Sequence, residues 1–368
     1  MELKPKRILC ISNHATMLGG GEHSFLQLLG MLPRPWVPIA TVPYKDKLEQ
    51  LLEQHGIRTE VLPLAPLRSM KLHAWVGTIY RLVRLCRTVN PVLLYANGPR
   101  AAFYCGLVGR LLQIPAIWHC RIAEPDPLMD WLLLKLCTKV IVNSQATKKR
   151  FHSACFKKLK VVYNGVDVDW YRQKVAKNSG RIDGSAKILL MVARISQLKR
   201  HDLLLSAFEH IAAEDIHLHL VCVGAPDKLE PHWWQLLQDR THTSSYSDRI
   251  HWIGHVDDAR PWYQSAYLLL LPSENESFGR VLIEAMANGV PVIASAAGGV
   301  PEIVRNGIDG LLVEPNSAGS LTNAIKTIVN DDTLRKRFSH SAYRRAEDFS
   351  LQTHVSHMTE QFQDLPGE

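Results

Sequence analysis

Long apolar runs, paired cysteines and zinc-binding spacings are all missing from this 368-residue chain. No stretch approaches the roughly 20 apolar residues that a membrane-spanning helix needs. The apolar run Ile8–Ile11, which follows a basic N-terminal segment, is too short for a signal peptide. The seven cysteines are scattered and include no C-x-x-C pair, so they indicate buried thiols in a reducing compartment. We therefore expect a cytoplasmic protein, or one bound peripherally at the inner face of the membrane.

Motifs of several enzyme and binding classes are also missing. The sequence has no H-E-x-x-H metalloprotease motif, no G-x-S-x-G nucleophile elbow, no zinc-finger spacing and no aromatic RNA-binding signature. Nucleic acid is therefore not expected as a partner. The formal net charge of +8 nevertheless favours an anionic partner, and a nucleotide diphosphate and a phospholipid surface both remain as candidates.

Short apolar runs alternate with amphipathic helical segments along the chain, a pattern typical of doubly wound parallel α/β sheets. The polar segment 173–187 has no apolar period, and we interpret it as a linker. It separates a predicted first domain, 1–172, from a second domain, 188–349, and each is long enough for its own core. Within the first domain, residues 145–156 are predicted as a single helix. The last predicted helix is 351–362, within the C-terminal segment at about 350–368.

The stretch 267–304 is the part of the sequence around which the rest is organised. Its pattern is strand, loop, helix, strand, loop, helix, over 267–271, 272–279, 280–288, 291–295 and the pair Gly298–Gly299 that precedes Pro301. The carboxyl ends of parallel strands meet at one edge of a sheet, and that edge binds ligands in open α/β sheets. Glu276, Glu284 and the glycine pair are therefore predicted at a ligand-binding edge.

The spacing of Glu276 and Glu284 argues against a glycoside hydrolase. Eight helical residues separate two backbones by about 12 Å, whereas catalytic carboxyls lie about 5–5.5 Å apart in retaining hydrolases and about 6.5–9.5 Å apart in inverting ones. The pair therefore indicates one long ligand that is contacted at two points. Gly298–Gly299, before a helix, predicts free main-chain N–H groups and a positive dipole end, which favour an anionic part of that ligand.

The segment Glu276–Glu284, ESFGRVLIE, and the adjoining EAMANGVPVIAS and GGVPEIV resemble the signature of glycosyltransferase family 4. The resemblance extends more weakly over nearly the whole chain. It implies the GT-B fold, in which two Rossmann-like domains face each other across a cleft and the C-terminal helix returns to the first domain. It also implies a retaining enzyme that binds a nucleotide-sugar donor in the second domain and its acceptor in the first.

Two cations follow the predicted strand 188–192. Arg194 and Lys199 are expected at the same sheet edge as Gly298–Gly299, where fixed positive charge stabilises a departing diphosphate. The resemblance implies that both hold the phosphates of the donor. One position departs from the family, because Arg200 stands where a glycine usually follows this lysine, which leaves the shape of the loop open.

The resemblance also implies roles for the two carboxylates. Glu276 would accept hydrogen bonds from hydroxyls of the transferred sugar, which makes it a catalytic candidate. Phe278 and Gly279 would contribute main-chain N–H groups beside it. Glu284 would bind the ribose, since a carboxylate offers two acceptor oxygens to a vicinal diol.

In the first domain, a glycine-rich turn and one histidine are the candidates. Gly20 and Gly21 follow the first predicted strand, and the resemblance implies that this loop faces the donor. His119 ends another predicted strand and resembles a family histidine near the reacting sugar, so we predict a catalytic role for it.

Two possible metal sites compete with this interpretation. Asp167-Val168-Asp169 has the D-x-D form of a metal and diphosphate ligand. It follows an Asn-Gly turn, however, and Asp as a turn former or helix cap explains it. His217 and His219 share one predicted strand face but have no third ligand in sight. We therefore expect no metal and no cofactor.

The sequence as a whole predicts a metal-independent, retaining glycosyltransferase. The donor is a nucleotide sugar, expected to be a UDP-sugar in preference to a GDP-sugar, and the acceptor is a hydroxyl of a cell-envelope, polysaccharide or lipid-linked glycan. A non-catalytic sugar-nucleotide-binding protein and a nucleotide-sugar epimerase on the same fold remain as alternatives. The amphipathic segment 71–89, with Arg81, Arg84 and Arg87, adds an anionic membrane surface as a possible partner.

Overall fold

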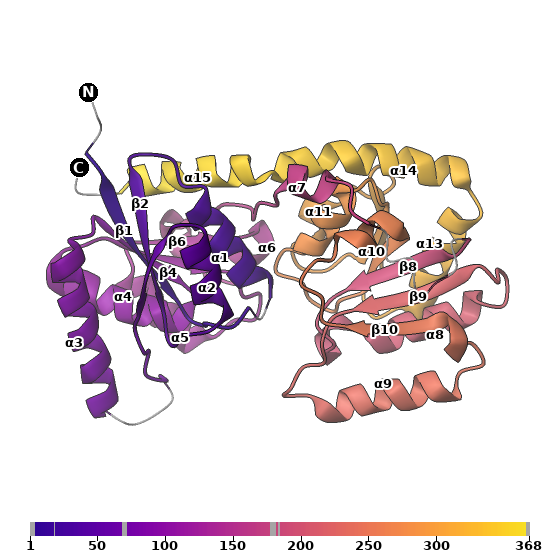
Figure 1. The fold of residues 1–368 in the computed structure, drawn as a ribbon, viewed down its shortest axis with the longest axis horizontal. Coiled ribbons are helices and arrows are strands. Elements are labelled where there is room, and N and C mark those ends of the chain that lie inside the picture. Colours follow the sequence, from indigo (N-terminus) through magenta and orange to yellow (C-terminus); the bar gives the residue numbers. More distant parts are fainter. Residues whose placement is uncertain (1–3, 18, 68–71, 177–181, 183–184, 366–368) are drawn as a thin grey trace. The chain divides into compact units, whose positions relative to one another are not determined.

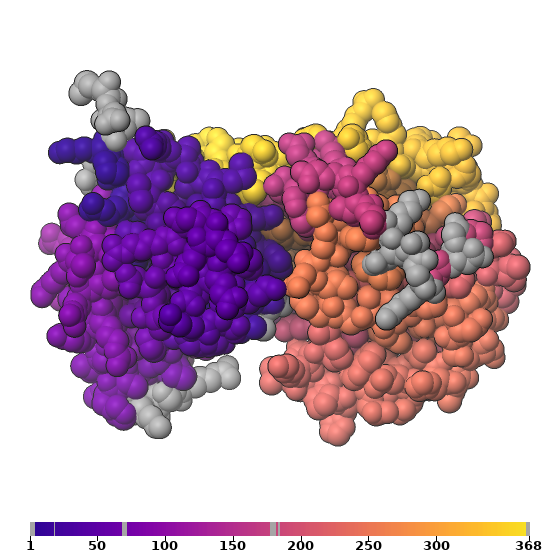
Figure 2. All heavy atoms as spheres, viewed as in Figure 1, coloured from indigo at the N-terminus to yellow at the C-terminus, as the bar shows by residue number. Residues whose placement is uncertain are grey.

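The computed structural model describes residues 4–17, 19–67, 72–176, 182 and 185–365, and the other residues are grey in Figures 1 and 2. The chain forms two compact units, Met1–Gly165 with Leu351–Glu368 and Val166–Ser350. The sequence-based boundary was placed after residue 172. Within the predicted linker 173–187, residues 177–181 and 183–184 lie outside the described residues.

The first unit is built on a seven-stranded parallel sheet in the order β3-β2-β1-β4-β5-β6-β7 (Figure 1). Its strands are β1 Lys6–Ser12, β2 Trp36–Val42, β3 Arg58–Val61, β4 Leu93–Asn97, β5 Ala116–Cys120, β6 Lys139–Val142 and β7 Leu159–Val161. Strands β4 and β5 are buried along their whole length, and β1 is buried from Ile8 to Ser12, because helices cover both faces. Continuous apolar runs, which predicted these strands, are what such burial requires.

Helices cover the two faces of this sheet in separate groups. The helical segments are α1 Gly20–Gly30, α2 Lys47–Gln54, α3 Leu72–Val89, α4 Pro99–Leu112, α5 Pro127–Leu136, α6 Gln145–Lys149, η1 Ser153–Lys158 and α15 Leu351–Gln363. Side chains of α3, α4 and α5 share one hydrophobic core, and those of α1, α2 and α15 share another. The predicted single helix 145–156 is wrong, because the chain takes an extended conformation at His152 between α6 and η1.

The C-terminal helix α15 belongs to the first unit, as the resemblance implied. Leu351, Val355, Met358 and Phe362 are buried in the core that α1 and α2 cover. The Phe362 ring packs edge-on against Trp36 and Tyr95, with ring centroids 5.7 and 5.8 Å apart. The first unit therefore closes its core with a segment from the far end of the chain.

The second unit contains a six-stranded parallel sheet in the order β10-β9-β8-β11-β12-β13. Its strands are β8 Lys187–Val192, β9 Leu218–Val223, β10 Ile250–Gly254, β11 Ala266–Leu271, β12 Val292–Ser295 and β13 Gly310–Val313. Its helical segments are α7 Val168–Arg172, η2 Gln197–Lys199, α8 His201–Ile211, α9 Pro231–Thr243, η3 Ser247–Arg249, α10 Arg260–Ser265, α11 Arg280–Ala287, α12 Val300–Ile303, α13 Ala318–Val329, α14 Asp332–Arg345 and η4 Ala346–Phe349. Both predicted Rossmann-like sheets are thus present.

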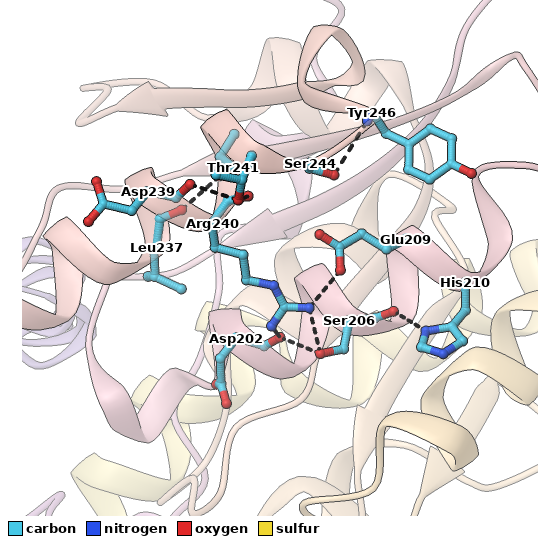
Figure 3. A network of polar contacts seen from close by, with 11 residues as sticks. Asp202, Ser206, Glu209, His210, Leu237, Asp239, Arg240, Thr241, Ser244 and Tyr246 are labelled. Carbon is cyan, nitrogen blue, oxygen red and sulfur yellow. Dashed lines mark hydrogen bonds and ion pairs between the residues drawn. The ribbon is translucent and has the colours of Figure 1, made fainter.

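One arginine fastens α9 to α8, the helix that follows the loop with Lys199 (Figure 3). Arg240 of α9 donates to the main-chain oxygen of Asp202 at 3.1 Å and to the Ser206 hydroxyl at 2.9 Å. It also forms an ion pair with Glu209 at 2.7 Å. Charge-assisted hydrogen bonds of this kind are the strongest that side chains form. They fix α8 against α9, and with α8 the end of the preceding loop.

Candidate functional site

The strand order of the second sheet reverses between β8 and β11, which lie side by side. Loops that leave the carboxyl ends of such a strand pair diverge and leave room for a ligand between them. The loop after β8 carries Arg194 and Lys199, and the loop after β11 carries Glu276, Phe278 and Gly279. The topology therefore brings the predicted phosphate and sugar ligands to one place.

Lys199 and Glu276 form an ion pair across this point. The Lys199 Nζ lies 2.5 Å from a carboxylate oxygen of Glu276. The two loops are also joined by a main-chain hydrogen bond, from the Glu274 N–H to the Leu198 carbonyl at 2.9 Å. Both charged side chains keep some exposure, 22% for Lys199 and 15% for Glu276. A cation and a carboxylate thus lie within reach of one ligand from solvent.

The structure shows the conformation of the loop at Arg200, where the family usually has a glycine. Its φ and ψ of 56° and 46° are left-handed, so it adopts the backbone conformation that glycine adopts without strain. Its guanidinium donates to both carboxylate oxygens of Asp202 at 3.0 Å and also to Asn316. These bonds offset the cost of the left-handed conformation, which is about 1–2 kcal/mol for a residue with a side chain. Arg200 thus adopts a conformation that suits glycine, and its side-chain bonds stabilise it.

The glycine pair after β12 packs closely against the main chain of Glu276. Gly298 has a φ of +55°, and a Cβ there would lie 2.0 Å from the main-chain oxygen of Glu276. The N–H of Gly299 donates to that same oxygen at 2.7 Å. The prediction of a free N–H at Gly299 is therefore wrong. The following helix, α12, is also only four residues long, Val300–Ile303, so it contributes little dipole.

Gly279 and Phe278 shape the start of α11. Gly279 precedes the helix with a φ of +97°, and a Cβ there would lie 3.0 Å from a methyl carbon of Leu282 and 3.4 Å from the Glu276 side chain. The Phe278 ring is buried against Phe349, with centroids 5.9 Å apart. Only the main chain of Phe278 can therefore reach a ligand, which agrees with the kind of contact predicted for it.

Glu284 lies in a buried cage of hydroxyl and guanidinium groups. Its carboxylate accepts a hydrogen bond from the Tyr263 hydroxyl at 2.8 Å and lies 3.4 Å from a guanidinium nitrogen of Arg280. Burial, and then the negative charge of Glu284, raise the pKa values of both Tyr263 and Tyr171 well above their usual value. A ribose would have to share this carboxylate with partners that already bind it, and the ribose role of Glu284 stays a prediction.

Arg194 is an exposed residue of the predicted donor site. Its side chain is 54% exposed, and one guanidinium nitrogen lies 3.2 Å from a carboxylate oxygen of Asp227. The loop that carries it is pressed against the loop after β9, because a Cβ at Gly224 would lie 1.9 Å from the Ala193 carbonyl oxygen. The main chain at Arg194 is therefore fixed while its side chain can turn toward a ligand.

The glycines at the start of α1 have no packing role in the part of the chain that the structure describes. A Cβ added at Gly19 or Gly21 would meet no atom within 4 Å. Gly20 is the first residue of α1, and its N-cap, Gly19, makes no side-chain capping bond. Open space above the first turn suits the approach of a ligand, and the donor contact of Gly20 and Gly21 stays a prediction.

His119 lies near the carboxyl end of a strand, as predicted, but its ring is not at the surface. The side chain is fully buried on β5, and its Nδ1 lies 2.5 Å from the Tyr95 hydroxyl. Burial, and then the positive charge of Arg121 and the neighbouring His354, lower its pKa well below the usual value. In this position the ring contacts the Tyr95 hydroxyl, and the catalytic role of His119 stays a prediction.

Sequence reasoning missed Arg121, which directly follows β5. Its guanidinium contacts the side chains of Asn97, Asn164, Ser24 and Tyr95, from four different segments of the first unit. A single arginine after a strand matches no motif. The only available signal was its position at the carboxyl end of a predicted parallel strand.

The two candidate metal sites have other partners. Asp167 caps α7, since its carboxylate accepts from the Trp170 N–H at 2.9 Å. His219 stands next to His251 of β10, with ring nitrogens 3.0 Å apart. Across the described residues, no group of three or more histidine, cysteine, aspartate or glutamate side chains is arranged to hold a metal ion. None of the described helices is long and apolar enough to cross a bilayer.

Two family models match consecutive parts of the chain. One, for glycosyl transferases group 1, matches residues 172–345, and one for glycosyltransferase family 4 matches residues 18–170. Among curated proteins, the D-inositol 3-phosphate glycosyltransferases of Streptomyces bingchenggensis and Geodermatophilus obscurus are 34% and 33% identical over 199 and 204 residues. The matches cover 51% and 53% of this chain, and only 44% and 45% of those relatives, so the chain spans less than half of their length.

Solved structures resemble this one over nearly its whole length. Anabaena HepE in complex with UDP and glucose has a TM-score of 0.87 at 23% identity, covering 97% of this chain and 99% of that one. Sucrose-phosphate synthase from Thermosynechococcus elongatus has a TM-score of 0.79 at 22% identity, covering 97% and 98%. At these identities the likeness establishes the fold, which is GT-B.

Proposed function

The chain belongs to glycosyltransferase family 4, and we propose that it transfers a sugar from a nucleoside diphosphate donor to a hydroxyl acceptor, with retention of configuration and without a metal ion. We propose a UDP-sugar as the donor in preference to a GDP-sugar. HepE was solved with UDP and with UDP-glucose, which supports this choice. The acceptor is a hydroxyl of a cell-envelope, polysaccharide or lipid-linked glycan.

The contact between Lys199 and Glu276 is the observation that carries the proposal. In a nucleotide sugar, the anomeric carbon is bonded directly to a phosphate oxygen. A residue that binds the phosphate and a residue that binds the sugar must therefore lie within a few ångströms of each other. Lys199 and Glu276 meet this condition, and donor binding would replace their mutual contact by two contacts with the ligand.

The reaction needs positioning and charge more than a protein base. The bond from the anomeric carbon to the phosphate oxygen breaks while the acceptor oxygen bonds to the same face of the sugar, which retains the configuration. The acceptor proton passes to the leaving phosphate oxygen. Arg194 and Lys199 stabilise the charge that develops on that phosphate, and Glu276 orients the sugar through its hydroxyls.

The remaining residues have supporting roles in this proposal. Gly20, Gly21, Gly279, Gly298 and Gly299 let main chain approach the donor or hold the Glu276 loop. Phe278 contributes its N–H group, and Glu284 binds the ribose while it keeps its bond to Tyr263. His119 acts as a positioning residue, because its ring is buried and bonded to Tyr95.

A thermal-shift screen against UDP, GDP and their common sugar derivatives tests the donor. The nucleotide sugar that raises the melting temperature most is then incubated with candidate acceptors, including D-inositol 3-phosphate because the curated relatives carry that name. A transferase forms a new glycoside and a nucleoside diphosphate. A non-catalytic binding protein is stabilised but leaves the donor intact, and an epimerase acts on it without any acceptor. Either of the last two results refutes the proposed reaction.

We also infer that α3 binds anionic bilayers reversibly. Large apolar side chains are exposed at helical spacing along its first half, at Leu72, Val76 and Tyr80, with exposures of 70%, 56% and 66%. Exposed arginines occupy its second half, at Arg81, Arg84 and Arg87. An apolar stripe beside cations is typical of interfacial helices. Residue 71, the predicted start of this helix, lies outside the described residues.

Liposome flotation at low salt tests this surface. The protein should float with vesicles that contain anionic lipid and remain in the dense fraction with neutral ones. The double variant Arg81→Glu/Arg84→Glu should abolish flotation. The matched control Lys336→Glu/Arg337→Glu makes the same charge change at exposed positions of α14 and should float like the parent protein. Equal recovery of all proteins from both kinds of vesicle would rule out the surface.

A further inference from the structure

Hydrogen bonds fix the Arg121 side chain at the carboxyl edge of the first sheet. Its Nε donates to the Asn164 side-chain oxygen at 3.3 Å, and one terminal nitrogen donates to the Asn97 side-chain oxygen. The other terminal nitrogen lies 3.3 Å from the Ser24 hydroxyl and 3.5 Å from the Tyr95 hydroxyl. Asn97, Asn164, Ser24 and Tyr95 are themselves buried, so the guanidinium is held in a fixed direction.

All four partners of Arg121 are neutral. Five other buried or half-buried arginines pair with carboxylates: Arg150 with Asp130, Arg172 with Glu347, Arg240 with Glu209, Arg260 with Asp258 and Arg280 with Glu284. A partly buried charge is costly unless it is paired. Arg121 therefore differs from these arginines, because no carboxylate in the described part of the chain neutralises its charge. Its charge is strong enough to help lower the pKa of the buried His119 ring.

The place of this cation in the fold points to a ligand. The strand order of the first sheet reverses between β1 and β4. Asn97 ends β4, Ser24 lies on α1 after β1, and Arg121 follows the adjacent β5. The guanidinium is therefore fastened to both sides of the switch point, where open α/β sheets bind their ligands.

Two helices begin beside the same residues. α1 has 11 residues and α4 has 14, and each follows a glycine N-cap, Gly19 or Gly98, that offers no capping side chain. First-turn N–H groups at such starts favour anions. Asn13 satisfies one of them, the Ala101 N–H, at 2.8 Å. A fixed cation and two helix starts therefore lie along one edge of the first sheet.

We propose that Arg121 binds an oxyanion, a phosphate or carboxylate, carried by the acceptor. Only the identification of the ligand as the acceptor rests on the proposed function, and the anion site itself does not. Asn97 and Asn164 orient the guanidinium. Four of its five N–H groups are directed at the four side chains, and the fifth, on the terminal nitrogen that bonds Asn97, donates to the anion. Acceptors with this group are bound more tightly than neutral acceptors of the same shape.

The direct test measures the binding of inorganic phosphate to the full-length protein by ³¹P NMR line broadening in the presence of saturating UDP. UDP occupies the proposed donor site, so that phosphate reports on other sites. The variants are Arg121→Met, Arg121→Lys and the control Arg110→Met. Arg110 lies in the same unit but donates to the main-chain oxygens of Lys135 and Leu136. Circular dichroism and thermal unfolding establish which variants fold.

Phosphate affinity should fall about tenfold or more in Arg121→Met, the loss expected for a charge-assisted hydrogen bond. It should stay unchanged in Arg110→Met. Arg121→Lys should bind several-fold more weakly than the parent protein, because lysine lacks the planar fork. If Arg121→Met does not fold, Arg121→Lys decides, and unchanged phosphate binding in that variant overturns the proposal. Unchanged binding in a folded Arg121→Met overturns it directly.

A competition experiment identifies which substrate carries the anion. In the transfer assay, inorganic phosphate should compete with the acceptor and not with the donor. Competition with the donor alone, or phosphate binding that UDP abolishes, would assign Arg121 to the donor and refute the acceptor role. The NMR experiment needs no sugar transfer, so a failed transferase assay and a failed anion site give different results.

Discussion

Replacing Gly298 by alanine should damage the donor site through the main chain of Glu276. The new Cβ would lie 2.0 Å from the Glu276 carbonyl oxygen and 2.9 Å from the Asn275 side-chain oxygen. The nearer atom belongs to the backbone, so no side-chain rotation can relieve the clash. The Glu276 loop must move, or the β12–α12 turn must open.

The size of the effect follows from a comparison with Gly307. Both glycines have a left-handed backbone, with φ of +55° and +74°, but a Cβ at Gly307 would meet no atom within 4 Å. Gly307→Ala should therefore lose only the conformational term, about 1–2 kcal/mol. Gly298→Ala should lose that term and also the 2.7 Å hydrogen bond from Gly299 to Glu276, about 1 kcal/mol more, together with the cost of moving the loop. We expect a total of about 3 kcal/mol or more.

Urea unfolding and calorimetry of UDP binding measure the two consequences. Displacing Glu276 by about 1 Å should reduce transfer by up to about a hundredfold, while Gly307→Ala should retain activity and nucleotide affinity. If the two variants have the same free energy of unfolding and the same transfer rate, the loop is not held by close approach at Gly298. The account of this turn would then be refuted.

Three further predictions follow. Lys199→Ala should weaken UDP binding about tenfold to a hundredfold, as expected for a lost charge-assisted hydrogen bond, and should change uridine binding much less; calorimetry showing unchanged UDP affinity would refute the phosphate role. Transfer should persist in EDTA and in Asp169→Asn, whereas loss in EDTA with rescue by Mn²⁺ would move the catalytic centre to the D-x-D segment. Burial lowers the pKa of His201 to about 3. Below about pH 6.5 the unfolded chain therefore binds a proton that the folded protein does not. The free energy of unfolding falls as the pH falls. His201→Phe should therefore lose about 2 kcal/mol less between pH 7 and pH 5 in urea titrations, and equal losses would contradict the buried neutral ring.

The sequence was sufficient for the order and nature of nearly all elements. Buried parallel strands are continuous apolar runs, so the predicted strands 188–192, 267–271 and 291–295 agree with the structure to within one residue, as does the predicted helix 280–288. The one clear failure among the helices was 145–156. The sequence pattern of this segment did not indicate that His152 takes an extended conformation between α6 and η1.

The candidate site was less predictable, because side-chain partners are set by packing. Strand order placed Lys199 and Glu276 at one edge, but their direct contact could not be inferred from spacing. The engagement of Glu284 by Tyr263 depends on how α10 and α11 pack, which no local pattern records. The burial of the His119 ring could not be predicted, because strand residues alternate between faces and the apolar run AIWHC does not show which face each residue takes.

The return of α15 to the first unit has a consequence for synthesis on the ribosome. The core between α1, α2 and the sheet needs Leu351, Val355, Met358 and Phe362, which are translated about 200 residues after the first unit's last strand. At roughly 5–20 residues per second, this takes about 10–40 seconds. Throughout that time Trp36 and Tyr95 lack the Phe362 ring that packs against them. The second unit, which is continuous in sequence, is therefore complete before the unit that was begun first, and the nascent first unit is the one that needs protection by chaperones.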